Sequence, residues 1–284
     1  MRPKRLLISD VESRKRAIIS ALEENEFEVQ FEELSSAAYE CFDAVIPLTL
    51  RDARMINARI LQGDTILGSR AIVAHEKVIN LTNDKLRFNR FLRRNYREMV
   101  PAFSRSAFPR PFLLKKRKDS GGLNTFLIRT EEDELQHQNL IHSDDFFCQD
   151  YTQGQVEYTA HFLFDDRILY GFTNMFRMNR DLFVRGEKMK PFTDVQVFAM
   201  PLEFGELFET ILRQIGFSGF GCFNYKLRDG VPQIFELNAR LGGSANYDLA
   251  NLFRALDRFQ AKVNLSEAEQ RLDAILANHK ENNN

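Results

Sequence analysis

The chain has 284 residues, with 39 Lys and Arg against 40 Asp and Glu, so its formal net charge is -1. This balance excludes a general nucleic-acid binder, because no basic surplus exists to replace the counterions of a phosphate backbone. Hydrophobic residues make up 44% and charged residues 28%, as in a globular chain, and the length favours two domains.

No apolar run approaches the roughly 18–20 residues that a membrane span needs. The apolar stretch near the N-terminus is too short for a signal peptide. The three widely spaced cysteines fit neither a disulfide framework nor a zinc site. We therefore expect a cytoplasmic protein with neither a membrane nor a nucleic acid as partner.

The first eighty residues alternate between strand and helix patterns. Strand patterns at residues 4–9, 27–31 and 42–47 surround a helical stripe over residues 11–22, which Asp10 is expected to cap. This order predicts a small parallel α/β unit over residues 1–81. Ligands of such units bind at the carboxyl ends of the strands, so Asp10 and residues 49–54 border a candidate crevice. Taken singly, a helix cap and a solvated helix start explain these residues more simply.

After residue 82 the pattern changes to hairpins with a few helices. A helix is expected to start at residues 83–85, and Thr130 with Asp133 predicts the capping box of a short helix that runs to Leu140. A further helical stripe is expected to end at Gly216. The predicted strands of this part cover residues 111–116, 126–128, 157–164, 168–172, 219–227 and 233–238.

The last predicted hairpin brings polar residues to one face. Glu236 and Asn238 alternate with apolar neighbours, as Asn224 does on the preceding strand. A two-residue turn would pair Asn224 with Phe235 and mix polar with core positions. A three-residue loop, residues 229–231, pairs Asn224 with Glu236 and gathers the apolar side chains, Phe235 included, on the other face. We predict the second register.

This register predicts a metal site. A carboxylate and two carboxamides converge, with Lys226 beside them, and Mg²⁺ prefers such oxygen ligands. Arg240, just beyond the strand, is placed to neutralise charge on a transferring phosphoryl group. Considered alone, the hairpin is better explained as the ordinary polar face of a sheet.

Residues 236–244, Glu-Leu-Asn-Ala-Arg-Leu-Gly-Gly-Ser, resemble the E-x-N-x-R-x-G-G-S signature of the ATP-grasp superfamily. Upstream segments resemble its other motifs in the right order, and the match runs from about residue 82 to 250. These segments are Asn-Asp-Lys at 83–85, Pro-Phe-Leu-Leu-Lys at 111–115, Ser-Gly-Gly at 120–122, and 147–157, which resembles the adenine hinge and ribose contact.

Three positions depart from the family pattern. Asn224 stands where many members have a carboxylate, and an amide at this position is similar to the carbamoyl-phosphate-synthase-like branch. Ala239 replaces the usual proline, and Gln149 stands where a glutamate is frequent. The resemblance implies that the N-terminal α/β unit precedes an α+β ATP-grasp module of two antiparallel-sheet subdomains that enclose ATP. The implied module covers residues 82–262 with a lid at about 95–146, and a helix or tail follows at 263–284.

The resemblance also implies roles for single residues. The implied ATP contacts are Lys85, Lys115, Ser120, Gly121, Gly122, Gln149, Asp150, Tyr151 and Glu157. The implied ligands of Mg²⁺, for which Mn²⁺ is an alternative, are Asn224, Glu236 and Asn238. Lys115 and Arg240 are the implied catalytic residues, and Gly242, Gly243 and Ser244 are placed at the acceptor. Arg177 joins them because residues 171–191 carry a basic surplus, which a solvated loop explains equally well.

The implied activity is an ADP-forming ligase reaction. A small carboxylate attacks the γ-phosphate of ATP, and an amine, for example an amino acid, then displaces phosphate from the acyl phosphate. The scattered histidines and the absence of a Ser-His-Asp or Cys-His pattern agree with a reaction that needs no nucleophilic side chain. A small-molecule kinase and a non-catalytic ATP-binding subunit stay open as alternatives. The oligomeric state is open too, with a homodimer as one candidate.

Overall fold

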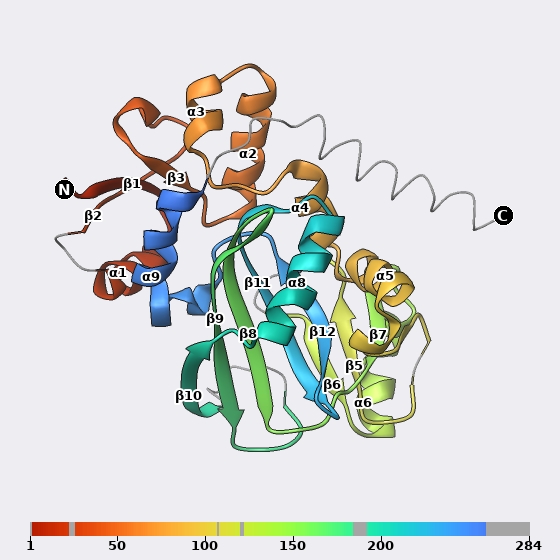
Figure 1. Ribbon diagram of the computed structural model, residues 1–284. Coiled ribbons are helices and arrows are strands. Elements are labelled where there is room, and N and C mark those ends of the chain that lie inside the picture. Colours follow the sequence, from red (N-terminus) through yellow and green to blue (C-terminus); the bar gives the residue numbers. More distant parts are fainter. Residues whose placement is uncertain (1, 23–25, 107, 120–121, 184–191, 260–284) are drawn as a thin grey trace.

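The computed structural model describes residues 2–22, 26–106, 108–119, 122–183 and 192–259, which form three β-sheets surrounded by helices (Figure 1). The N-terminal sheet is parallel, with the strand order β2–β1–β3. Two antiparallel sheets follow, with the orders β4–β7–β5–β6 and β10–β9–β8–β11–β12. The predicted fold class, a small parallel α/β unit before two antiparallel sheets, is confirmed.

The strands are β1 (Lys4–Ser9), β2 (Phe27–Glu32), β3 (Ala44–Ile46), β4 (Phe103–Ser104), β5 (Phe112–Lys116), β6 (Thr125–Ile128), β7 (Phe146–Asp150), β8 (Val156–Asp165), β9 (Arg167–Met178), β10 (Phe192–Ala199), β11 (Ser218–Arg228) and β12 (Val231–Asn238). The α-helices are α1 (Glu12–Ala21), α2 (Leu50–Leu61), α3 (Thr65–Arg70), α4 (Glu76–Asn83), α5 (Lys85–Asn95), α6 (Glu131–Gln136), α7 (Gln138–Ile141), α8 (Leu202–Gln214) and α9 (Leu249–Arg254). Short 3-10 helices are η1 (Tyr39–Cys41), η2 (Arg97–Met99), η3 (Gly243–Asp248) and η4 (Ala255–Arg258).

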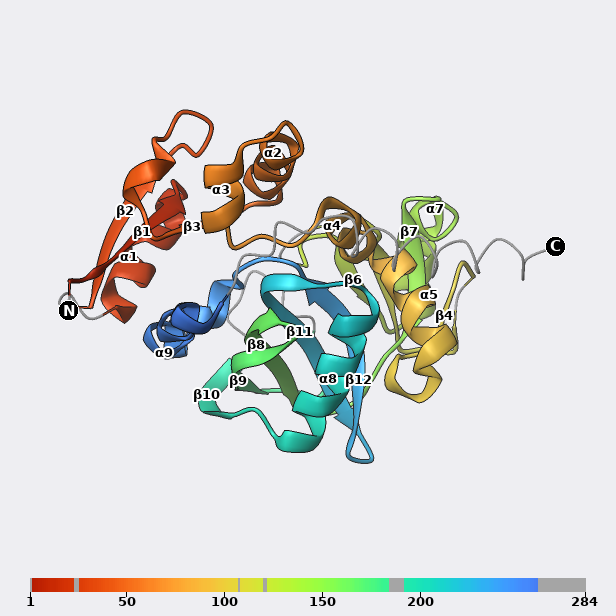
Figure 2. The same ribbon diagram turned by 45° about the horizontal axis from the view of Figure 1, so that its top comes forward.

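The parallel sheet is covered on both faces. Leu6 of β1 belongs to a buried cluster with Ile18 of α1, whereas the next residue, Leu7, points to the opposite face and lies in a cluster with Ile56 of α2. Phe253 of α9 joins the first cluster, and Figures 1 and 2 both place α9 beside α1. The end of the described chain therefore packs against its beginning.

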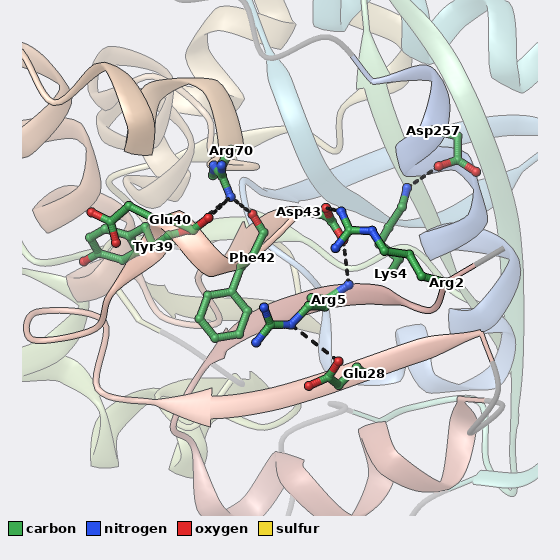
Figure 3. A network of polar contacts seen from close by, with 10 residues as sticks. All are labelled: Arg2, Lys4, Arg5, Glu28, Tyr39, Glu40, Phe42, Asp43, Arg70 and Asp257. Carbon is green, nitrogen blue, oxygen red and sulfur yellow. Dashed lines mark hydrogen bonds and ion pairs between the residues drawn. The ribbon is translucent and has the colours of Figure 1, made fainter.

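Polar contacts surround the start of β1, the central strand of the same sheet (Figure 3). The Asp43 carboxylate accepts hydrogen bonds from the Arg2 guanidinium at 2.7 Å and from the backbone N–H of Arg5 at 2.8 Å. Lys4 forms an ion pair with Asp257 of η4. Each of these two ion pairs has one mostly exposed partner, Arg2 in the first and Asp257 in the second, so each contributes little stability. The apolar clusters therefore hold the N-terminal unit to the rest of the chain.

Helix α8 covers one face of the five-stranded sheet (Figure 2). Phe208 and Leu212, two residues of the predicted stripe, are fully buried with Phe223 and Tyr225 of β11. The Phe208 and Phe223 rings stack with their centroids 4.4 Å apart. Since successive residues of a strand point to opposite faces, the polar residues of β11 are left for the other face, away from α8.

The β11–β12 hairpin closes with a two-residue turn, so the predicted three-residue loop is wrong. Arg228 pairs with Val231, and the two residues between them, Asp229 and Gly230, have φ values of 53° and 80°. Positive φ at both central positions is typical of a tight turn that matches the twist of a hairpin.

The predicted pairing of Asn224 with Glu236 is nevertheless confirmed, because a β-bulge shifts the register by one residue. Ile234 pairs with Tyr225 and Glu236 with Asn224, which leaves Phe235 as the extra residue. The bulge turns Phe235 away from the apolar face, so its expected place in the core is wrong. It is half-buried and lines the central cavity instead.

Two further local predictions need correction. Helix α1 begins after Val11, without a side-chain cap, and Asp10 forms an ion pair with Lys15 at 2.8 Å instead. The helix predicted to reach Leu140 is interrupted at His137, which separates α6 from α7. The capping box at the start of α6 and the positive φ of 65° at Gly216, just after α8, are as predicted.

The predicted domain limits stay predictions. The limit between residues 81 and 82 lies inside α4, and the tail at 263–284 lies outside the described residues. Among the residues described, we find no helix with the length and hydropathy that a membrane crossing requires.

Candidate functional site

A cavity of about 370 Å³ lies between the two antiparallel sheets. Leu113 and Lys115 of β5 and residues of β7 line it from the four-stranded sheet. Residues of β8, β11 and β12 line it from the five-stranded sheet, on the face that α8 does not cover. Most of the polar residues predicted to bind ATP and metal meet here.

Lys85 is placed by the start of α5. The helix begins within residues 83–85, as the sequence predicts, and its N-cap Asp84 accepts a hydrogen bond from the backbone N–H of Arg87 at 3.1 Å. The Lys85 ammonium is 5% exposed, donates to the backbone carbonyl of Asp119 and lies 3.4 Å from the Glu236 carboxylate. A buried cation therefore stands directly beside the acidic group of the hairpin.

Lys115 faces the same space from β5. It is 5% exposed, donates to the side-chain oxygen of Gln149 at 3.1 Å, and its ammonium lies 5.0 Å from the centroid of the Phe235 ring. Burial lowers the pKa of Lys115 to about 8, although the nearby Glu236 carboxylate acts in the opposite direction. Lys115 thus pays a desolvation cost that an anion in the cavity would offset.

The acid and the two carboxamides of the hairpin all line the cavity. The Asn224 amide donates to Glu236 at 2.9 Å, and its oxygen accepts a hydrogen bond from the Thr159 hydroxyl at 2.9 Å. Burial raises the pKa of Glu236, but the positive charges of Lys85 and Lys115 outweigh this effect. The net pKa of the carboxyl is lowered, so Glu236 is ionised at neutral pH.

A carboxylate with amide oxygens beside it is a donor set that suits Mg²⁺, and Glu236 and Asn238, which both line the cavity, stay its predicted ligands. Asn224 turns its nitrogen toward Glu236, so its role as a ligand stays a prediction. Within the described part of the chain, no three His, Cys, Asp or Glu side chains form a metal cluster. Any metal here would depend on this single carboxylate.

The opposite end of the cavity is formed by the end of β7 and the segment after it. Gln149, Asp150 and Tyr151 line the cavity, as does Glu157 of β8, which is 6% exposed. The Asp150 carboxylate pairs with Arg228 at 2.8 Å. This end therefore offers backbone groups and a carboxylate, as the resemblance implies for a nucleoside.

Lys226 shares this end. Its ammonium donates to the carbonyls of Thr152 and Gly154, both at 3.0 Å, and to the Tyr151 hydroxyl at 3.2 Å. It lies 4.6 Å from the centroid of the Tyr151 ring and 4.2 Å from that of Phe183. Burial lowers the pKa of Lys226 to about 8. The lysine fixes the segment after β7 to the five-stranded sheet.

The signature residues after β12 line the remaining end. Arg240, Gly242, Gly243 and Ser244 all border the cavity. A side chain at Gly242 would place its Cβ 2.6 Å from the His161 ring, so only glycine allows this close approach. The Ser244 hydroxyl is 2.9 Å from the His161 ring nitrogen Nε2.

Several predicted site residues do not join this cavity. Arg177 is exposed on β9 and is not among the lining residues. Asp10 and residues 49–54 do not line it either, and Thr49 is the N-cap of α2. Gly122 does line the cavity, whereas Ser120 and Gly121 lie outside the described residues.

Other lining residues were not predicted. Arg14 reaches the cavity from α1, Thr159 contacts Asn224, and Phe183 and Phe235 add aromatic faces. Thr159 lies on the alternating pattern of β8, which was a usable signal. The positions of Arg14, Phe183 and Phe235 depend on a bulge or on contacts between distant segments. Strand and helix periodicity in the sequence predicts neither.

Comparison with solved structures gives similar folds at low sequence identity. D-alanine–D-alanine ligase from Bacillus anthracis, complexed with ATP, matches with a TM-score of 0.60 and 14% identity over 95% of this chain and 99% of that chain. Phosphoribosylamine–glycine ligase from Thermotoga maritima matches with a TM-score of 0.62 and 16% identity over 91% and 76%. A candidate ATP-grasp superfamily protein from Archaeoglobus fulgidus matches with a TM-score of 0.58 and 14% identity over 91% and 89%.

The chain therefore has the fold of these three structures, and the expected fold class is confirmed. No protein-family model matches the sequence, and no curated protein sequence matches it. The carbamoyl-phosphate-synthase-like branch stays a prediction, since the similarity extends to several kinds of ligase.

Proposed function

We propose that the protein is an ATP-dependent ligase that activates a small carboxylate as an acyl phosphate and couples it to an amine. The observation that carries this proposal is the centre of the cavity, where two buried lysines flank one carboxylate between the two antiparallel sheets. The solved ligases of similar fold, one of them with ATP, support the proposal.

Lys85 and Lys115 would bind the phosphates of ATP, because buried ammonium groups gain from an anionic partner. Glu236 and Asn238 would hold Mg²⁺, for which Mn²⁺ is a substitute, and Asn224 keeps the Glu236 carboxylate in place through its hydrogen bond. When bound, the metal ion would neutralise charge on the phosphates.

The nucleoside would lie at the other end, where backbone groups of residues 149–151 contact adenine and Glu157 accepts hydrogen bonds from the ribose hydroxyls. Gly122 would let the loop after β5 approach the phosphates without a side chain in between. These roles, the ATP-grasp module at residues 82–262 with its lid, a homodimer and a cytoplasmic location stay predictions.

The reaction would need no nucleophilic side chain. A carboxylate oxygen of the substrate attacks the γ-phosphorus, the bond to ADP breaks, and an acyl phosphate forms. The amine then attacks the acyl carbon, loses a proton and releases phosphate. Arg240 would stabilise the charge on the transferring group, and the backbone at Gly242 and Gly243 with Ser244 would receive the acceptor.

The test is ADP release by the purified protein with ATP, Mg²⁺ and a panel of small acids, with and without hydroxylamine. We expect ADP release with at least one acid and a hydroxamate when hydroxylamine traps the acyl phosphate. A stable phosphorylated product without hydroxamate would identify a kinase instead. Failure to bind ATP at millimolar concentration would contradict both reactions.

A further inference from the structure

Arg14 belongs to the N-terminal unit, yet its guanidinium lines the cavity. Its Nη2 donates to the backbone carbonyl of Gly242 at 3.0 Å, and its Nε is buried with no hydrogen-bond partner among the described residues. The ammonium of the neighbouring Lys15 forms ion pairs with both acidic residues at the start of α1, Asp10 at 2.8 Å and Glu12 at 3.0 Å. These two carboxylates therefore pair with Lys15 rather than with Arg14.

Arg14 and Arg240 line the same end of the cavity. Among the described residues, neither arginine makes an ion pair with a carboxylate. Of the three acidic residues of the lining, Glu236 pairs with Lys85, and Asp150 and Glu157 belong to the nucleoside end. Two guanidinium groups in a partly buried site favour an anion between or beside them.

The two arginines also lie at different distances from the reaction centre. Arg240 also lines a second, small pocket together with Lys85 and Glu236, whereas Arg14 does not line that pocket. Arg240 therefore lies nearer the metal carboxylate than Arg14 does. The reacting carboxylate of the substrate has to lie next to the γ-phosphate and Arg240, which leaves Arg14 for a group one step further out.

On the basis of the proposed function, we propose that Arg14 binds a second anionic group of the substrate. The compound to be activated would then carry, besides its reacting carboxylate, a further carboxylate or phosphate group. A guanidinium recognises either group with two parallel hydrogen bonds, and the one hydrogen bond of Arg14 among the described residues uses a single N–H of Nη2. Arg14 would be a specificity-determining residue supplied by the N-terminal unit.

The experiment is a calorimetric titration of the full chain with small acids, with and without AMP-PNP and Mg²⁺. Succinate and glutarate are the dicarboxylate probes, phosphoglycolate is the phosphate-bearing probe, and butyrate is the monoanionic reference. We expect at least one dianion to bind the wild type tenfold or more tightly than butyrate. Whichever probe binds more tightly, a dicarboxylate or phosphoglycolate, identifies the kind of anionic group that Arg14 binds.

Arg14→Gln should abolish this preference and leave the affinity for butyrate unchanged, and Arg14→Lys should restore part of it. Arg16→Gln is the matched control, because Arg16 is exposed two residues further along the same helix. A preference that survives in Arg14→Gln would overturn the inference, as would equal binding of dianions and butyrate by the wild type. Equal weakening of butyrate and dianions would show that Arg14 binds the reacting carboxylate itself, which also contradicts it.

The failure of the proposed function gives a different result. If AMP-PNP does not bind the wild type, the ligase proposal fails, and the titrations without nucleotide still decide whether Arg14 selects dianions. Thermal melts of each variant identify any that do not fold. If Arg14→Gln is one of these, the comparison of Arg14→Lys with Arg16→Gln decides the question, because Arg14→Lys keeps the charge.

Discussion

The centre of the cavity joins opposite charges through buried contacts. Lys85 pairs with Glu236, Lys115 donates to Gln149, and Gln149 donates in turn to Asn89. Each of these groups is held by a defined element, so the site is ordered before a ligand arrives. Such preorganisation lowers the entropy cost of binding a triphosphate.

Replacing Lys115 with alanine should weaken ATP binding by tenfold or more. A charge-assisted hydrogen bond is worth about 1.5–3 kcal/mol, and the buried ammonium faces the space where the phosphates are expected. Calorimetric titration with AMP-PNP and Mg²⁺ measures the effect. Lys116→Ala is the control, since the next residue of β5 points to the other face. Equal affinity in Lys115→Ala and the control would remove Lys115 from the phosphate site.

The affinity for ATP should also depend on pH. Burial lowers the pKa of Lys115 to about 8 in the unliganded protein, and bound phosphates would favour its charged form. Binding should therefore be strongest below pH 8 and weaken as the pH rises above it, by up to about tenfold per pH unit. Titrations at several pH values test this. Lys115→Arg, which stays charged, should show a flatter profile, and an identical profile in both proteins would contradict the assignment.

At the scale of elements, the start of α5 links fold and site. Asp84 is 5% exposed, caps the helix and forms an ion pair with Arg117 at 2.5 Å, while the next residue is Lys85. Burial raises the pKa of Asp84, but the Arg117 hydrogen bond helps to hold the net value below its usual range. Because the folded-state pKa is lowered, the stabilisation is present above the unfolded-state pKa and is lost as the pH falls through the folded-state pKa.

Asp84→Ala should lower the free energy of unfolding by about 2–3 kcal/mol, since it removes a cap and leaves Arg117 without its partner. Asp84→Asn keeps the cap and should cost about half as much. Urea denaturation measures both variants. Equal stability of the wild type and Asp84→Ala would show that the cap does not hold the start of α5.

The hairpin shows how far sequence patterns reach at this scale. Asn224 was predicted to lie opposite Glu236 because that register keeps the apolar residues on one face, and the structure confirms the pairing. The loop length was wrong, because a tight turn and a bulge at Phe235 compensate for each other. Two compensating local choices give the same pairing, so periodicity cannot tell them apart. The motifs at Lys85 and Lys115 were readable because a helix start and a strand each fix one side chain locally.

At the scale of the whole molecule, the cavity combines all three parts of the chain. The four-stranded sheet supplies Lys115, the five-stranded sheet supplies Glu236, and the N-terminal unit supplies Arg14. The contribution of Arg14 was not predictable, because it depends on how α1 lies against η3, which follows it by more than 200 residues. Only the packing of distant segments gives this information.

Because both antiparallel sheets line the proposed nucleotide site, AMP-PNP with Mg²⁺ should stabilise the folded chain. At a concentration 100 times its dissociation constant, the gain is about 2.7 kcal/mol, which corresponds to a rise in Tm of roughly 5 °C for a chain of this size. Differential scanning calorimetry measures it, with Lys115→Ala at the same nucleotide concentration as the control. An unchanged Tm in the wild type would mean that the folded state does not bind the nucleotide.

The most direct test of the account is a crystal structure of the protein with AMP-PNP and Mn²⁺, whose anomalous signal locates the metal. We predict a triphosphate beside Lys85 and Lys115, a manganese ion on Glu236 and Asn238, and the adenine against residues 149–151. A nucleotide bound outside this cavity, or a metal ion away from Glu236, would contradict the account.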